Sequence, residues 1–202
     1  MTITQRSHPS RRRRSPDETR ALALEAAQTI LVRDGPQALT LQAVAGAIGM
    51  THGNLTHHFG TSAALQAALI IKMGEGLARD VQAATLRLRT GEATAREIVD
   101  LVFDALERDG YGRLIAWLSS SGQLDRLAPV LGVISGSVKA LKAGGPTEAD
   151  REVKGAGAIT AALLSSALAA SLVGPPLQAA TGLRSDGLRV LAARQLESLR
   201  TR

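Results

Sequence analysis

Apolar residues recur along the chain at the spacing of α-helices, and no segment alternates between apolar and polar residues as a half-buried strand does. Two helix starts carry strong signals, because Ser15 and Thr94 each stand three residues before a glutamate in the pattern of a capping box. Glycines and prolines mark the helix ends. The predicted fold class is all-α, with helices at residues 16–34, 41–48, 52–58, 62–89, 94–109, 111–121, 124–143, 147–173 and 185–200.

Glycine and proline also affect the two longest predicted helices. Gly74 and Gly76 predict a bend or a split within residues 62–89. The triplet Gly174-Pro175-Pro176 predicts that the helix beginning near residue 147 ends at 173, because proline cannot donate a helical hydrogen bond. The uncharged segment 155–183 is long enough for a membrane span. Its small and hydroxyl residues favour a packing helix instead, so we expect no membrane partner.

The positive charge of the chain is concentrated at its beginning. The 202 residues carry a net charge of +6, yet residues 35–60 contain no Asp, Glu, Lys or Arg. Arg6 and Arg11–Arg14 precede Ser15, so a basic arm is attached to a nearly uncharged segment; the arm is either a solvated tail or a phosphate-seeking element. Cysteine is absent, which excludes disulfides, thiolate metal sites and a cysteine nucleophile. No secretory signal is recognisable, and we expect a cytoplasmic protein.

Residues 40–59 have the pattern of two short helices joined by a tight turn. Val44 and Ile48 share one side of the first helix, and Leu55 and Phe59 share one side of the second. Between them, Gly49 can adopt the left-handed backbone, and the following Thr51 can cap the second helix. This is the frame of a DNA-binding helix-turn-helix.

The ordered motifs across this region resemble the tetracycline-repressor (TetR) family of bacterial regulators. The resemblance covers residues 18–70 and rests on Ala26-Ala27, Asp34-Gly35, Thr40, Val44-Ala45, Gly49-Met50-Thr51, Gly53-Asn54-Leu55, His57-His58-Phe59 and Leu65. It implies base contacts from His52 to His57 and phosphate contacts from Thr40, Thr56, His58 and the helix start at Thr61-Ser62. The chain departs from the family pattern in having Thr56 in place of a tyrosine, Ser62 in place of a lysine, and no aromatic residue near Leu31 and Pro36.

The chemistry of these residues suits DNA. Helix N-termini direct unpaired amides outward, where phosphate oxygens bind. Asn54 can pair with a base edge, most naturally adenine, and His52 can donate to guanine; the alternative is that the histidines only face solvent. The predicted DNA-binding residues are Thr40, Thr51, His52, Gly53, Asn54, Thr56, His57, His58, Thr61 and Ser62, together with Arg11, Arg12, Arg13 and Arg14 of the arm.

The rest of the chain predicts a pocket and a dimer interface. The resemblance implies a small-molecule pocket, for which Met73, Phe103, Tyr111, Trp117 and Leu131 are the predicted lining; the alternative is that these residues are ordinary core. The scarcity of aromatic residues, 2% of the chain, favours an apolar or amphipathic effector. A stripe of small residues precedes a last amphipathic helix, which predicts a four-helix homodimer interface or, alternatively, packing within one chain. The predicted interface residues are Gly155, Ala158, Ala162, Ser165, Ala169, Leu188, Leu191 and Leu199.

These features predict a basic disordered arm at residues 1–15, a helix-turn-helix DNA-binding domain at 16–61 and a ligand-binding and dimerisation domain at 62–202. The predicted function is a ligand-responsive transcription regulator, a repressor, that binds a palindromic double-stranded DNA operator as a homodimer and is released by a small molecule. Two alternatives stay open: an all-α small-molecule carrier, and a dimeric DNA-binding protein without an inducer. We expect neither an enzyme nor a cofactor. We also expect no metal site, because the neighbouring His57 and His58 point about 100° apart and cannot share an ion.

Overall fold

The computed structural model describes residues 15–143 and 154–198, and within these ranges all regular secondary structure is helical. The predicted all-α fold class is therefore confirmed. The helices are α1 (Pro16–Asp34), α2 (Leu41–Ala47), α3 (His52–Phe59), α4 (Ser62–Thr90), α5 (Ala95–Glu107), α6 (Tyr111–Ser120), α7 (Ala128–Ala143), α8 (Lys154–Thr181) and α9 (Gly187–Ser198). Two short 3-10 helices, η1 (Pro36–Ala38) and η2 (Leu124–Leu127), lie between them.

Both predicted capping boxes are present. The amide of Glu18 donates to Ser15 Oγ at 3.1 Å, and the amide of Ser15 donates to Glu18 Oε2 at 2.7 Å. Thr94 and Glu97 make the same reciprocal pair at the start of α5, with both distances 3.3 Å. The first turns of α1 and α5 are thus fixed by side chains within three residues of the backbone groups that they satisfy.

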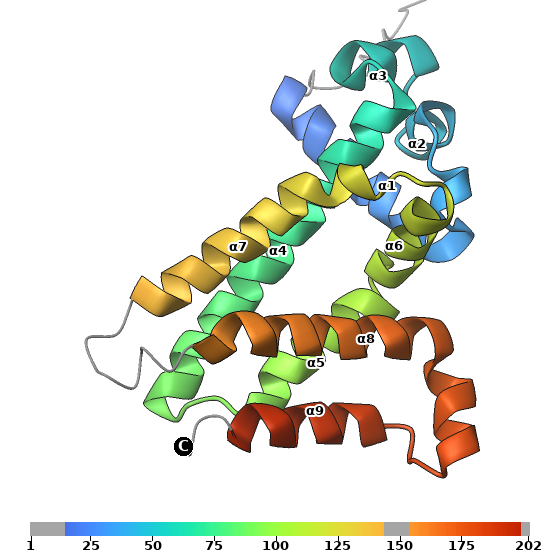
Figure 1. The fold of residues 1–202 in the computed structure, drawn as a ribbon. Coiled ribbons are helices and arrows are strands. Elements are labelled where there is room, and N and C mark those ends of the chain that lie inside the picture. Colours follow the sequence, from blue (N-terminus) through green and yellow to red (C-terminus); the bar gives the residue numbers. More distant parts are fainter. Residues whose placement is uncertain (1–14, 144–153, 199–202) are drawn as a thin grey trace, which may run out of the picture.

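Two predicted boundaries are wrong, and one predicted split is absent. α4 is continuous from Ser62 to Thr90, so Gly74 and Gly76 do not split it; a Cβ at Gly74 would lie 2.9 Å from Val130, so this glycine lets α7 approach α4 closely. The predicted helix 124–143 is divided into η2 and α7. Helix α8 continues through Pro175 and Pro176 and ends at Thr181, and it changes direction before that end (Figure 1). Proline is tolerated because its fixed φ is helical, and a bend accommodates the missing amides.

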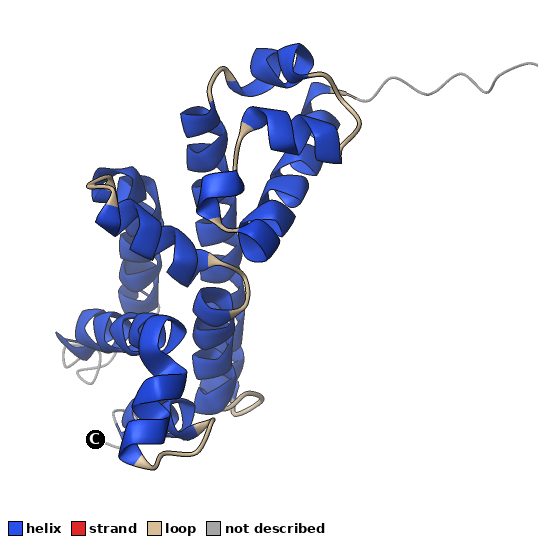
Figure 2. Cartoon of the chain, turned by 90° about the vertical axis from the view of Figure 1, so that its right-hand side faces the viewer, coloured by secondary structure: helices blue, strands red, loops and turns tan. Residues whose placement is uncertain are grey.

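The helices form a head and a body joined by one long helix (Figure 1). The head comprises α1, α2 and α3, and α4 runs from it to the far end of the body, which we define as the described residues from 62 onward. The head packs on a core that includes Leu31, Val44 and Leu55, with Leu114 and Leu118 of α6 completing it. A second core joins α5, α8 and α9, so the head and the far end of the body have separate buried clusters. Figure 2 shows that both parts consist of helices connected by loops.

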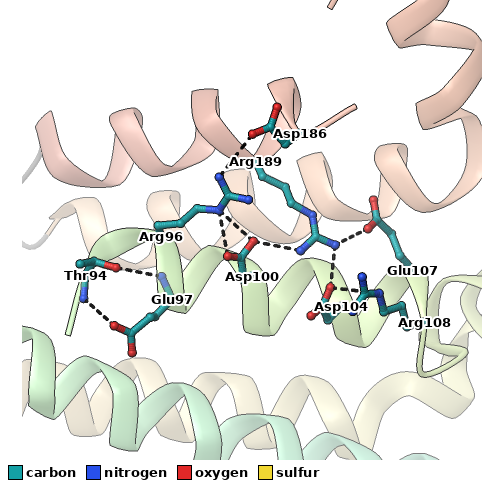
Figure 3. A network of polar contacts seen from close by, with 9 residues as sticks. All are labelled: Thr94, Arg96, Glu97, Asp100, Asp104, Glu107, Arg108, Asp186 and Arg189. Carbon is teal, nitrogen blue, oxygen red and sulfur yellow. Dashed lines mark hydrogen bonds and ion pairs between the residues drawn. The ribbon is translucent and has the colours of Figure 1, made fainter. Parts of the chain in front are cut away.

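A polar clamp fastens α9 to α5 (Figure 3). The guanidinium of Arg189, a side chain only 14% exposed, donates to Asp100 at 2.9 Å and to Asp104 at 2.7 Å, and also binds Glu107. Partial burial by itself would raise the pKa of Asp100, but hydrogen bonds from Arg189 and Arg96 outweigh it and hold that pKa below its ordinary value. The clamp thus combines burial with hydrogen-bonded charge, the arrangement in which an ion pair contributes most.

Candidate nucleic-acid interface

The turn between α2 and α3 has the geometry of a helix-turn-helix. Thr40 caps α2 by accepting from the amide of Ala43 at 3.1 Å, and Thr51 caps α3 by accepting from the amide of Asn54 at 3.3 Å. Between them Gly49 has φ of 67°, the left-handed conformation that the sequence predicts for the turn. Both helices are fixed by apolar contacts with the core of the head, through the fully buried Val44 and Leu55.

One side of α3 is left free by this packing. His52, Gly53, Asn54 and His57 are exposed, whereas Leu55 and Phe59 on the opposite side are buried. A Cβ at Gly53 would meet no atom within 4 Å, so packing does not require a glycine there. Because Gly53 has no side chain, the backbone of α3 at this position can approach another molecule closely.

Thr56 and Ser62, two predicted phosphate contacts, use their hydroxyls inside the head. Thr56 Oγ1 donates to the carbonyl of His52 at 2.9 Å. Ser62 Oγ accepts from the amide of Leu41 at 3.2 Å, which joins the start of α4 to the start of α2. A phosphate contact from Thr56 would therefore replace a hydrogen bond that its O–H already donates, whereas Ser62 only accepts and its O–H can still donate to a phosphate oxygen. Thr61 Oγ1 is likewise a cap, accepting from the amide of Ala64 at 3.1 Å.

Arg20 of α1 is a functional candidate that sequence reasoning missed. Its guanidinium lies 4.5 Å from the centroid of the Phe59 ring and donates to the carbonyl of His58 at the C-terminal end of α3. This contact spans 38 residues, so no local pattern announces it. Arg20 brings an exposed positive charge to the C-terminal end of α3, a helix that contains no Lys or Arg. The predicted arginines of the arm, Arg11–Arg14, lie outside the described residues.

Two further residues that the sequence analysis did not identify, Gln66 and Arg126, connect the head with the body. Gln66 of α4 donates to the carbonyl of Leu39, just before α2, at 3.1 Å. Arg126 of η2 in turn donates to Gln66 Oε1 at 3.0 Å. The position of α2 therefore depends on groups from the body as well as on the core of the head.

The predicted ligand residues do not gather in one place. Met73 and Tyr111 line a cavity of about 300 Å³ where α1, α4, α5 and α6 meet. The other three predicted residues do not line this cavity. Phe103 is fully buried in the core between α5 and α8, and Trp117 packs against the core of the head. Leu131 is 59% exposed, because its neighbour Val130 takes the place against Gly74 of α4.

Most of the predicted interface residues of α8 lie on its outer side. Ala158, Ser165 and Ala169 are exposed, as is Leu191 of α9, while Ala162 and Leu188 are half-buried. The large side chains Leu172, Val173 and Leu177 are exposed as well, with Leu172 at 50%. The other two predicted interface residues, Gly155 and Leu199, lie outside the part of the chain for which the structure describes side chains. By length and composition alone, Gly157–Thr181 would also suit a membrane span, and 17% of its most apolar window is buried.

Comparison with known proteins yields matches in structure but not in sequence. No protein-family model matches the chain, and no curated protein matches it significantly. A structure described as a TetR-family transcriptional regulator from Rhodococcus sp. superposes with a TM-score of 0.59 at 14% identity, covering 91% of this chain and 98% of that one. The chain has the TetR-type fold. The predicted resemblance is thus confirmed at the level of the fold.

Two further structures support the same TetR-type fold. The multidrug binding protein EbrR, complexed with imidazole, gives a TM-score of 0.58 at 23% identity and covers 88% of this chain and 94% of its own. A structure described as a transcriptional regulator from Pseudomonas aeruginosa PAO1 gives 0.54 at 20% identity, with 93% and 92% covered. All three likenesses extend over the head and most of the body, so the TetR-type architecture is not confined to the helix-turn-helix.

Proposed function

We propose that this protein is a transcription regulator that binds a palindromic DNA operator as a homodimer and represses until a small molecule releases it. The observation that carries this proposal is the exposed side of α3, where His52, Asn54 and His57 face outward from a capped and firmly packed helix. A rigid helix with short polar side chains and a glycine suits the major groove. The TetR-type fold supports the same conclusion.

Recognition divides between bases and phosphates. Asn54 pairs with a base edge, most naturally adenine, and His52 donates to guanine. Amides at the helix starts at Thr40, Thr51 and Thr61 bind phosphate oxygens. Because residues 35–60 carry no charged side chain, the positive charge comes from Arg20 and from the arm.

The exposed apolar residues of α8 and α9 support a homodimer. Small residues such as Ala158 and Ala169 allow close approach of a second helix, and Leu172 and Leu191 supply apolar area. Two chains joined there carry two heads, which read half-sites about 34–36 Å apart or a multiple of that distance.

The division of labour follows from this arrangement. Residues 1–15 form the arm, 16–61 bind DNA, and 62–202 bind the effector and the second chain. EbrR, of the same fold, is complexed with imidazole, which supports a small-molecule site in this protein. The candidate surfaces are suited to binding, so the protein acts as a regulator rather than as an enzyme. It acts in the cytoplasm, where bacterial DNA lies.

Selection from a pool of random DNA duplexes tests the proposal. We expect the full chain to select a palindrome, and Asn54→Ala to relax its preference at one position in each half-site by about 10- to 100-fold. The matched control is Gln82→Ala, another exposed amide, on α4 and far along the chain from α3. A selection that returns no common sequence, or an Asn54→Ala profile identical to that of the control, would contradict the proposal.

A further inference from the structure

His57 lies in the middle of the side of α3 that points away from the core of the head. Leu55 and Phe59 fix the helix from the buried side, and a helix turns about 100° per residue, so His57 points about 160° away from each of them. Gly53 precedes His57 by one turn on the same exposed side, and a Cβ at Gly53 would meet no atom within 4 Å. The ring of His57 therefore projects from α3 next to bare backbone, where the edge of a base can reach it.

The positive charge of α3 depends on protons. None of residues 35–60 is Asp, Glu, Lys or Arg, yet α3 holds three of the chain's four histidines, at positions 52, 57 and 58. Histidine is the residue type that ordinarily gains or loses its charge between about pH 5 and pH 8. Because DNA is densely negative, a protein surface that carries protonated histidines binds it more tightly than the same surface without the protons.

Of the three histidines, His57 is the best placed to carry a positive charge. The carbonyls at the end of a helix favour a cation, and His57 and His58 lie in the last turn of α3, whereas His52 is its first residue. The rings of His57 and His58 have their centroids 6.1 Å apart, so a charge on one opposes a charge on the other. Arg20 already places a permanent positive charge beside His58, since it donates to the carbonyl of His58 and lies over the ring of Phe59. We therefore expect one proton per α3, on His57.

The helices packed against α3 bring few ionisable side chains near it. Helix α2 has none, and the first in α4 is Lys72, which lies 4.0 Å from Glu25 of α1. The first turn of α1 carries Asp17 and Glu18, and the carboxylate of Glu18 is used in the capping box of that helix. Among the described residues no carboxylate is paired with His57. A positive charge on His57 is thus left for a partner outside the chain.

The chemistry of a protonated histidine selects among the bases. An imidazolium ring has two N–H donors and no acceptor. In the major groove guanine presents two neighbouring acceptors, N7 and O6, whereas adenine presents one acceptor and one donor and cytosine presents a donor. A hydrogen bond from a charged donor is also stronger than one from a neutral donor. A donor-only side chain in the middle of α3 therefore matches guanine.

We propose that His57 reads one guanine in each half-site as an imidazolium, so that binding of the operator takes up about one proton per chain. The proposal rests on the proposed function and adds to it a specificity-determining residue and a dependence on pH. It assigns base recognition to the residue that follows Asn54 by three positions, on the same exposed side of α3.

Anisotropy titrations of the full chain with its selected palindrome, at constant ionic strength, test the proposal. We expect affinity to be about 10- to 30-fold higher near pH 6 than near pH 8, because each of the two heads takes up a proton. We expect His57→Ala to reduce this ratio to less than about threefold and to relax the preference for guanine at one position in each half-site by about tenfold. His57→Arg, a permanent cation that also matches guanine, should keep the preference and give a ratio near one.

The matched control is His8→Ala, which removes the histidine outside α3 and should leave the ratio unchanged. Circular dichroism of each variant checks that the fold is retained. A ratio near one in the unmodified chain, a ratio that His57→Ala leaves unchanged, or a ratio that His8→Ala removes would each overturn the proposal. So would a loss of affinity in His57→Ala that is equal for all sequences, because that result assigns His57 to a phosphate.

The outcomes also separate this proposal from the proposed function. A chain that selects no palindrome overturns both. A palindrome that is selected, and that is bound with equal affinity at both pH values, overturns the role of His57 alone and leaves the regulator in place.

Discussion

The head and the body of this molecule use their polar side chains in different ways. In the head, hydroxyl caps such as Thr40 and Thr51 satisfy backbone amides three residues away, and the outer side of α3 carries no ion pair. In the body, Arg189 reaches across 89 residues to Asp100. The starts of α2 and α3 are thus fixed by caps that leave the exposed side of α3 free, whereas in the body charged side chains link α5 with α9.

This contrast has a functional meaning. A surface that binds DNA needs polar groups without internal partners, and α3 has them in His52, Asn54 and His57. Under the proposed function the body also responds to a small molecule, and the Asp104–Arg189 pair lies next to the cavity. The following predictions break or sharpen the contrast, from the largest expected effect to the smallest.

Removing residues 1–14 tests whether the head obtains its charge from the arm. We expect affinity for every duplex to fall by at least about tenfold, and the slope of log affinity against log salt to decrease by as much as about 4, since five arginines are lost. Anisotropy titrations over a range of salt concentrations measure both quantities. An unchanged slope would show that the arm contacts no phosphate and that the head binds without it.

Gly112→Ala tests the close packing of the body. A Cβ at Gly112 would lie 2.3 Å from Ser171 Oγ of α8 and 2.7 Å from the carbonyl oxygen of Leu106. Because the backbone oxygen cannot rotate away, we expect the free energy of unfolding to fall by about 2–3 kcal/mol in urea titrations. In the control Gly132→Ala, where a Cβ meets no atom within 4 Å, stability should be equal or slightly higher. Equal losses in both variants would contradict this account of α6 and α8.

Arg189→Gln tests the clamp between α5 and α9. The change leaves Asp100, Asp104 and Glu107 on one helix without their shared cation, and we expect a loss of about 1–2 kcal/mol in the free energy of unfolding. Binding of a half-site duplex by the head should be unchanged. The control is Arg184→Gln, an arginine in the segment between α8 and α9 that is 90% exposed and should contribute little. A variant that is as stable as the control would show that the clamp contributes no net stability.

Neutralising Asp100 or Asp109 gives the smallest expected effect, and the two substitutions should change stability at pH 7 in opposite directions. The pKa of Asp100 is lowered in the folded protein, so its contribution is present above its ordinary value near 3.8 and is lost as the pH falls through the folded pKa. The pKa of Asp109 is raised, so its ionisation near neutral pH costs stability instead. We therefore expect Asp109→Asn to raise the thermal midpoint at pH 7 slightly and Asp100→Asn to lower it. Shifts of the same sign would contradict these assignments.

The parts that the sequence predicts are those fixed by neighbours along the chain. The starts of α1 and α5 follow from Ser15 and Thr94, and the turn before α3 follows from Gly49 and Thr51, because each device acts within a few residues. Each amphipathic pattern also predicts which residues of a helix are apolar. It does not predict which neighbouring helix they meet.

Contacts between distant segments cannot be predicted from local spacing. Val130 lies against Gly74 of α4, and its neighbour Leu131, a predicted pocket residue, is exposed. The cavity brings together Asp80, Asp104 and Asp109 from three separate segments, and no spacing along the chain encodes that meeting. The end predicted at Gly174-Pro175-Pro176 failed because proline removes amides from a helix without forbidding its backbone angles.

The most direct test of the central claim is the affinity of the full chain for its selected palindrome, for one isolated half-site and for a scrambled duplex, at about 150 mM salt. We predict binding of the palindrome by two chains, at least about a thousandfold tighter than binding of the scrambled duplex, with the half-site in between. Weak and equal binding of all three duplexes, abolished by added salt, would contradict the account and leave α3 without a role in reading DNA.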